Sequence, residues 1–143
     1  MKTLDFYFDF GSPYSYLAYH RLQHVAKKNP IKIQYYPVIL GGIFKATNNQ
    51  SPAMIPAKAQ YLFKDMQDWS KHWDIPFQFN PFFPVNTFML MRAAIGYQQL
   101  APAQFEHYVA TCFSAMFEHP VNLNDEGVIE KTLLDAGLSY KEY

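Results

Sequence analysis

The N-terminal part of the chain alternates between hydrophobic and polar positions. The hydrophobic positions fall at Leu4, Phe6, Phe8 and Phe10. A period of two is typical of a β-strand, so we expect a strand over residues 4–10. Ser12 then combines a favoured N-cap residue type with Pro13 at the first helical position. The helix that they predict ends at Lys27-Lys28-Asn29-Pro30, because cations suit its negative end and the proline cannot continue it.

A second alternating run follows this helix. Ile31, Ile33 and Tyr35 predict a strand that ends near Pro37. Strand, helix and strand at these spacings form a βαβ unit, which implies parallel strands and a right-handed crossover. Gly41-Gly42 opens what we expect to be an irregular loop reaching Pro52.

The remainder of the chain has a helical pattern. We expect a helix over residues 56–73 and a second one from a cap at Asn86 to about Gln99. A third helix begins at Pro102. A fourth runs from a cap at Asn124 to about Ala136, with Gly137 in the C-terminal position. The helix after Pro102 carries a broad stripe predicted to be buried, at Phe105, Tyr108, Val109, Cys112, Phe113 and Met116.

Composition narrows the range of functions. The 143 residues fit one domain, or one domain with an insertion, and 50% hydrophobic content with 18% aromatic content is enough for a sizeable core. Twelve basic and twelve acidic residues cancel, so the chain has no electrostatic footprint for nucleic acid or anionic membranes. No apolar run approaches the roughly 20 residues that span a bilayer. With Cys112 as the sole cysteine and no visible secretory signal, we expect a cytoplasmic protein.

The two predicted strands do not make a stable sheet alone. Parallel sheets require both faces covered, and isolated strand pairs are marginal. Nothing after Pro84 predicts a strand, so we expect that further strands once followed, or still follow in a longer product. The alternative is a small α+β domain whose strands pack on the helices, paired with a second copy as a homodimer.

The turn that follows the first strand resembles that of a thioredoxin-like fold. Redox members of that fold carry Cys-x-x-Cys at this turn, whereas this chain has Ser12 and Ser15 and cannot perform thiol–disulfide exchange there. More specifically, the chain resembles the 2-hydroxychromene-2-carboxylate isomerases and the kappa-class glutathione transferases. Three stretches carry the resemblance: residues 8–18, residues 41–52, and the set Pro56, Lys58, Tyr61 and Asp65, with Pro84-Val85-Asn86-Thr87 and Arg92 also fitting.

The resemblance implies an α/β fold with a thioredoxin-like βαβ start and an inserted all-helical domain, as in the DsbA-like proteins. Residues 1–52 would be the N-terminal part of the thioredoxin-like domain, and residues 53–143 the helical insertion. Family members continue with a Val-Pro segment and two more strands that supply part of the glutathione site. Because we expect those strands to be missing, the activity of these 143 residues is an open question.

The resemblance also implies a glutathione-dependent enzyme acting on a small aromatic or electrophilic substrate. In that reaction the glutathione thiolate adds to the conjugated system of a hydroxychromene carboxylate, rotation follows, and elimination gives a trans-benzylidenepyruvate-type product. A kappa-like transferase that conjugates electrophiles is one alternative. A non-catalytic thioredoxin-like fragment or binding module is another.

The resemblance assigns roles to particular residues. Glutathione would be bound by Ser12, Tyr14, Ser15 and Asn49, with Ser12 as the catalytic residue that donates a hydrogen bond to the thiolate. The substrate would be bound by Lys45, Tyr61, Asn86 and Arg92. Without the resemblance each has a simpler interpretation: a helix cap for Ser12 and Asn86, a solvated loop for Lys45 and Asn49, and a surface ion pair for the charged groups near Tyr61 and for Arg92.

Two further groups have structural interpretations. His20 and His24 share a helix face at a metal-binding spacing, but the glutamate of the zincin motif is missing and no third ligand is evident, so we expect no metal site. The phenylalanines between Pro76 and Pro84 are better explained by packing than by an aromatic substrate pocket.

Overall fold

The computed structural model describes residues 1–140, and the chain divides into two compact units. The first unit comprises residues 1–8 and 12–77. The second comprises residues 9–11 together with the chain from Gln78 onward. The expected domain division between residues 52 and 53 stays a prediction, since it concerns where a family insertion begins.

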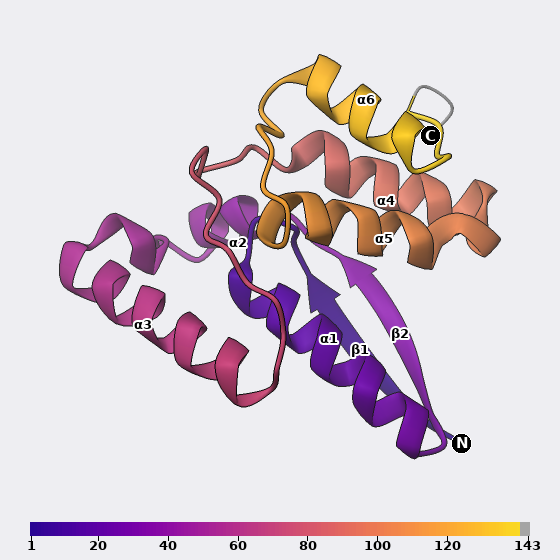
Figure 1. Ribbon diagram of the computed structural model, residues 1–143, viewed down its shortest axis with the longest axis horizontal. Helices are drawn as coiled ribbons and strands as arrows, with labels where there is room; N and C mark the ends of the chain where they lie inside the picture. The colour runs from indigo at the N-terminus through magenta and orange to yellow at the C-terminus, as the bar shows by residue number, and fades with distance from the viewer. Residues whose placement is uncertain (141–143) are drawn as a thin grey trace. The chain divides into compact units, whose positions relative to one another are not determined.

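The first unit is built on the predicted βαβ arrangement (Figure 1). Its elements are, in order, β1 (Lys2–Phe8), α1 (Pro13–Lys28), β2 (Ile31–Pro37), α2 (Leu40–Ala46), the 3-10 turn η1 (Pro52–Met54) and α3 (Pro56–His72). The strands are parallel, with Lys2 opposite Ile31 and Phe8 opposite Pro37. The predictions of two parallel strands joined by a helix, and of a helix over residues 56–73, are confirmed.

One face of this sheet carries the aromatic core of the first unit. Phe6 and Phe8 stack with ring centroids 5.4 Å apart, and Tyr35 meets both rings edge-on. The Gln23 side chain of α1 donates a hydrogen bond to the Tyr35 hydroxyl, so the helix lies on this face. The alternation read from the sequence therefore reports burial correctly, because successive side chains of a strand point to opposite faces.

The prediction of an irregular loop after Gly41-Gly42 is wrong, because this segment begins with the helix α2. The two glycines lie in its first turn, where an unfavourable helix propensity costs less than in the interior. The helix is closed by Asn48 in a left-handed conformation with φ of 53°. The Asn49 N–H donates to the Phe44 carbonyl at 2.8 Å, which completes a Schellman motif. Because asparagine is favoured in this left-handed position, Asn48 is the residue that could have indicated the helix end from the sequence.

The second unit is helical in its described part. It contains α4 (Phe88–Leu100), α5 (Pro102–Phe117) and α6 (Glu126–Asp135), and α5 contacts both of the others (Figure 1). The predicted stripe on α5 is buried throughout. Tyr97 and Tyr108 stack with ring centroids 4.4 Å apart, and the Tyr108 hydroxyl donates to the Leu90 carbonyl at 2.7 Å. No strand follows β2 within residues 38–140.

Two predicted helix caps are each wrong by one residue. The N-cap of α4 is Thr87 rather than Asn86, and the N-cap of α6 is Asp125 rather than Asn124. Asn86 still serves the helix start, since its side-chain oxygen accepts from the Phe88 N–H at 3.1 Å. Asn124 instead stabilises the loop before α4. Its side-chain oxygen accepts from the Asn86 N–H, and its NH₂ group donates to the carbonyls of Phe82 and Pro84.

A buried carboxylate fixes the short segment that the second unit takes from the N-terminal region. Asp9 is 4% exposed and accepts hydrogen bonds from the Gly11 N–H at 2.9 Å and from the Thr87 hydroxyl at 2.6 Å. A methyl group on Gly11 would lie 3.3 Å from the Thr87 methyl. Residues 9–11 are therefore held tightly at the start of α4.

Candidate functional site

Ser12 lies at the N-terminus of α1 as its N-cap, with Pro13 at the first helical position. Its Oγ accepts a hydrogen bond from the Ser15 N–H at 3.1 Å. A hydroxyl has one donor and two acceptor lone pairs, so the cap occupies one lone pair and leaves the O–H able to donate. The structural and chemical roles of Ser12 are therefore compatible with each other.

The first turn of α1 provides a further donor beside this hydroxyl. Pro13 has no N–H, and the Ser15 N–H is taken by Ser12, which leaves the Tyr14 N–H with no hydrogen-bond partner among residues 1–140. No acidic residue lies in this turn, whereas Lys27 and Lys28 lie in the last turn. The positive end of the helix dipole is thus not neutralised by a carboxylate of its own turn and favours an anion.

Tyr14 links this helix start to α3. Its hydroxyl donates to Asp65 Oδ2 at 2.8 Å across 51 positions of sequence. Burial raises the pKa of Tyr14 to about 12, and the hydrogen bond to Asp65 adds to the increase. Tyr14 is therefore a neutral donor at any physiological pH.

A hollow of about 320 Å³ opens beside Tyr14 in the first unit. Its walls come from the first turn of α1, from η1 and from the start of α3: Tyr14, Pro52, Ala57, Lys58, Tyr61 and Leu62. The lining is apolar and aromatic with a single ammonium group, that of Lys58. Such a lining suits an organic anion that has an apolar body.

The structure brings some of the predicted site residues together. Ser12, Tyr14 and Ser15 share one turn, and Tyr61 joins Tyr14 at the hollow. Lys58, one of the residues that carry the resemblance, is the hollow's cation. The pairing of Tyr14 with Asp65 was missed, because no local pattern reports a contact between residues so distant in the sequence.

Two other predicted residues lie near the end of α2. Lys45 lies in its last turn, and Asn49 follows as the final residue of the Schellman motif. Both are exposed, and within residues 1–140 neither side chain hydrogen-bonds or ion-pairs with the Ser12–Ser15 turn. Asn49 Oδ1 accepts from the Gln50 N–H at 2.8 Å, so this turn engages its side-chain oxygen. Their ligand roles stay predictions.

Asn86 and Arg92 belong to the second unit. Asn86 lines a hollow of about 350 Å³ at the starts of α4 and α6, together with Met89, Asn124 and Tyr140 among others. Arg92 is exposed on α4, and no ion-pair partner for it lies within the described part of the chain. The assignment of both residues to substrate binding stays a prediction.

The cysteine and one histidine of α1 have shifted pKa values. Cys112 is buried in the second unit, and burial raises the pKa of its thiol to about 12. The pKa of His24 is lowered, first by the nearby Lys28. Residues 1–140 hold no cluster of three or more His, Cys, Asp or Glu side chains that could bind a metal, and none of their helices is long and apolar enough to cross a bilayer.

The chain matches one family model and is similar to proteins of two enzyme classes. The family model described as the DSBA-like thioredoxin domain matches residues 3–143. Glutathione S-transferase kappa 1 of Caenorhabditis elegans is 40% identical over 84 residues, covering 58% of this chain and 37% of that protein. 2-Hydroxychromene-2-carboxylate isomerase of Pseudomonas sp. strain C18 is 38% identical over 117 residues, covering 80% of this chain and 53% of the isomerase.

A solved structure of an isomerase with the same name is also similar to this chain. The structure of SeMet 2-hydroxychromene-2-carboxylate isomerase superposes with a TM-score of 0.77 at 29% identity, covering 96% of this chain and 67% of that one. The chain thus spans about half of the length of the isomerase from Pseudomonas and less of the kappa transferase. Six α-helices and a short two-stranded sheet in residues 1–140 fit this mixed α/β architecture. With a family model covering nearly its whole length, the chain belongs to the DSBA-like thioredoxin domain family.

Proposed function

We propose that this chain forms part of a glutathione-dependent isomerase of the 2-hydroxychromene-2-carboxylate type. The observation that carries the proposal is the Ser12 hydroxyl, which caps α1 through one lone pair and keeps its O–H free to donate. The names of the relatives support the substrate class. Because the chain spans only part of those proteins, the activity is a proposal about the protein to which this sequence belongs.

The first turn of α1 fits a thiolate. The Ser12 O–H and the Tyr14 N–H are donors at the positive end of a 16-residue helix. A charge-assisted hydrogen bond and the helix dipole both favour the ionised form of a thiol and lower its pKa. Bound glutathione would supply a nucleophile that adds reversibly to a conjugated double bond, which permits rotation without net oxidation or reduction. Ser12 acts on that sulfur by hydrogen bonding and needs no histidine base.

The hollow beside Tyr14 fits the rest of such a ligand. Glutathione carries two carboxylates and an ammonium group, and the Lys58 side chain offers a cation at an otherwise apolar wall. We assign Ser12, Tyr14, Ser15 and Asn49 to glutathione, and Lys45, Tyr61, Asn86 and Arg92 to the aromatic acid substrate. The involvement of Lys58 is the addition that the geometry of the first unit supports.

A kappa-like glutathione transferase is the second candidate. The 40% identity with the kappa 1 transferase of Caenorhabditis elegans favours it, although the match covers 58% of this chain. Both enzymes would use the same thiolate at Ser12. They differ in the fate of the sulfur, because conjugation consumes glutathione and isomerisation returns it.

We also propose a cytoplasmic homodimer. A reducing, glutathione-rich compartment suits a chain with a single, buried cysteine. Tyr7 and Tyr36 stack on the exposed face of the two-stranded sheet with ring centroids 4.7 Å apart, and such a face favours a covering partner. Sedimentation of the purified chain tests the dimer directly.

Thermal denaturation with glutathione tests the proposal. A ligand at about 100 times its dissociation constant adds about 2.7 kcal/mol to the free energy of unfolding, which for a chain of this size raises the Tm by roughly 5–10 °C. Turnover of 2-hydroxychromene-2-carboxylate with no loss of free thiol supports isomerisation, whereas thiol consumption supports conjugation. No Tm shift at millimolar glutathione would leave the chain as a non-catalytic binding module.

A further inference from the structure

The hydrogen bond between Tyr14 and Asp65 joins two separate helices of the first unit. Tyr14 lies in the first turn of α1, two residues after Ser12, and Asp65 lies in the middle of α3. The phenol donates to the carboxylate at 2.8 Å. Such a charge-assisted bond is stronger and more directional than one between neutral groups. It therefore fixes the position of the Tyr14 ring relative to α3.

This ring position matters because Tyr14 forms one wall of the 320 Å³ hollow. The Tyr14 side chain is 43% exposed, so packing holds it on one side only. Lys58 and Tyr61, from the start of α3, line the same hollow. Asp65 follows Tyr61 by four residues on the same helix face and itself is half-buried. One carboxylate thus ties the Tyr14 ring to the helix that carries Lys58 and Tyr61.

We propose that Asp65 is a positioning residue that holds Tyr14 in place as a wall of the hollow and so sets the affinity of the site for glutathione. The inference rests on the proposed function of this site. Asp65 acts through Tyr14, since its bonded carboxylate oxygen points to the phenol. Loss of the bond allows the ring to rotate into solvent and opens the hollow, while the Ser12 hydroxyl stays where it is.

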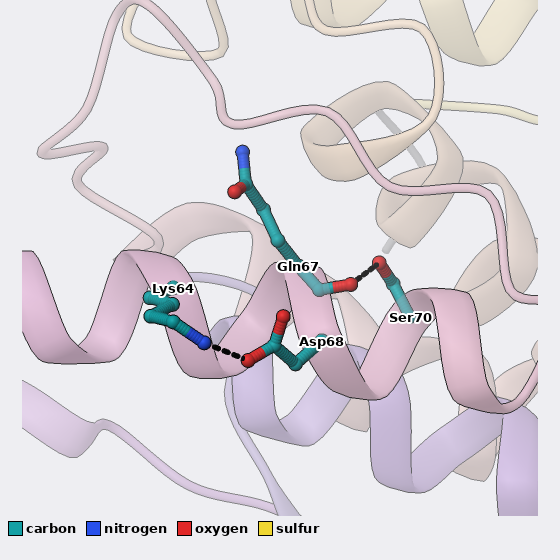
Figure 2. A network of polar contacts seen from close by, with 4 residues as sticks. All are labelled: Lys64, Gln67, Asp68 and Ser70. Atoms are coloured by element: carbon teal, nitrogen blue, oxygen red, sulfur yellow. Dashed lines mark hydrogen bonds and ion pairs between the residues drawn. The ribbon is translucent and has the colours of Figure 1, made fainter.

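The same helix provides a matched control. Asp68 forms an ion pair with Lys64 on the exposed side of α3, and the buried Ser70 of the same helix donates to the Gln67 carbonyl at 2.9 Å (Figure 2). Asp68 is a carboxylate of the same charge, three residues after Asp65, and exposed surface pairs of this kind have little energetic weight. Its removal changes the charge of the helix without touching Tyr14.

The experiment is a double-mutant cycle on the full chain, with the dissociation constant of glutathione as the readout. We expect Asp65→Ala and Tyr14→Phe each to raise that constant by about fivefold, roughly the worth of one net hydrogen bond, and the double variant to raise it no further. Asp65→Asn keeps an acceptor oxygen and should recover part of the affinity. Asp68→Ala should bind glutathione as the wild type does and should keep the wild-type kcat.

Titration of Tyr14 gives a readout that does not depend on activity. Asp65 accepts from the phenol, Tyr61 acts on it electrostatically, and Lys58 lines the same hollow. NMR of proteins labelled at the tyrosine ring carbon, with Tyr14→Phe to assign the resonance, should show the pKa of Tyr14 falling from about 12 in Asp65→Ala and not in Asp68→Ala. This separates a released phenol from a general loss of stability.

Three results bear on the proposal in different ways. Multiplicative effects of Asp65→Ala and Tyr14→Phe would show that the two residues act independently, and would overturn it. Unchanged glutathione affinity in both variants, with normal binding by the wild type, would overturn the positioning role alone. Absence of glutathione binding by the wild type would remove the proposed function, and the positioning role of Asp65 with it.

Discussion

Replacement of Ser12 by alanine removes two interactions of different kinds. The first is the capping bond from the Ser15 N–H to Ser12 Oγ at 3.1 Å. Loss of a serine cap costs about 1 kcal/mol, which lowers the Tm by roughly 2–4 °C. The second is the hydrogen bond that we propose to the glutathione thiolate. Bonds to charged groups contribute about 1.5–3 kcal/mol, or roughly 1–2 pKa units of the bound thiol.

The two losses differ in how they depend on pH. The wild-type site favours the thiolate, so the pKa of the bound thiol lies below the value of about 8.5 for an ordinary cysteine thiol. Ser12→Ala raises the pKa of the bound thiol again and so reduces the fraction of thiolate at low pH. At a pH below both pKa values we expect turnover to fall by about 10–100-fold. Above both pKa values the thiol is ionised in either protein, so this part of the deficit disappears.

The assay is kcat for 2-hydroxychromene-2-carboxylate against pH, at saturating glutathione, with thiolate absorbance measured in the complex. Asp125→Ala is the matched control, because Asp125 caps α6 by accepting from the third helical N–H, Val128, at 3.1 Å as Ser12 does in α1. It should lose similar stability and no activity. A deficit in Ser12→Ala that is constant with pH, or one that Asp125→Ala shares, refutes the proposed role of the hydroxyl.

Three further predictions concern stability and reactivity in the second unit. Thr87→Val should destabilise the chain by about 1–3 kcal/mol in urea denaturation, because buried Asp9 loses a donor, and Thr87→Ser should restore most of it; equal stability of the two variants would contradict this. Gly137→Ala should cost about 1–2 kcal/mol at φ of 73°, although open space surrounds the added methyl, and an unchanged Tm would contradict the strain. Cys112, with a pKa of about 12, should resist a disulfide reagent at pH 8 until the protein is unfolded; rapid labelling of the native chain would contradict its burial.

Local signals explain what could be predicted from the sequence. The alternation at Phe6 and Phe8, the Ser12-Pro13 start and the stripe on α5 each depend on residues within one element, and the structure confirms all three. The helix α2 was not predicted, because Gly41-Gly42 is typical of a loop.

Tertiary contacts explain what could not be predicted. Thr87 donates to a carboxylate 78 positions earlier, and so the cap of α4 shifted by one residue from the expected Asn86. Tyr14 and Asp65 were both part of the resemblance, yet nothing in the sequence pairs them. The lining of the hollow combines residues of α1, η1 and α3, so it follows from the fold of the first unit rather than from any single motif.

The central claim is that glutathione binds at the start of α1, with its sulfur at Ser12. The most direct test is an amide NMR titration of the 143-residue chain with glutathione. The account predicts saturable shifts of the Tyr14 and Ser15 amides, which need more glutathione to saturate in Ser12→Ala, with none at Val128 in the matched first turn of α6. Absence of shifts at millimolar glutathione, or equal shifts at both helix starts, would contradict it.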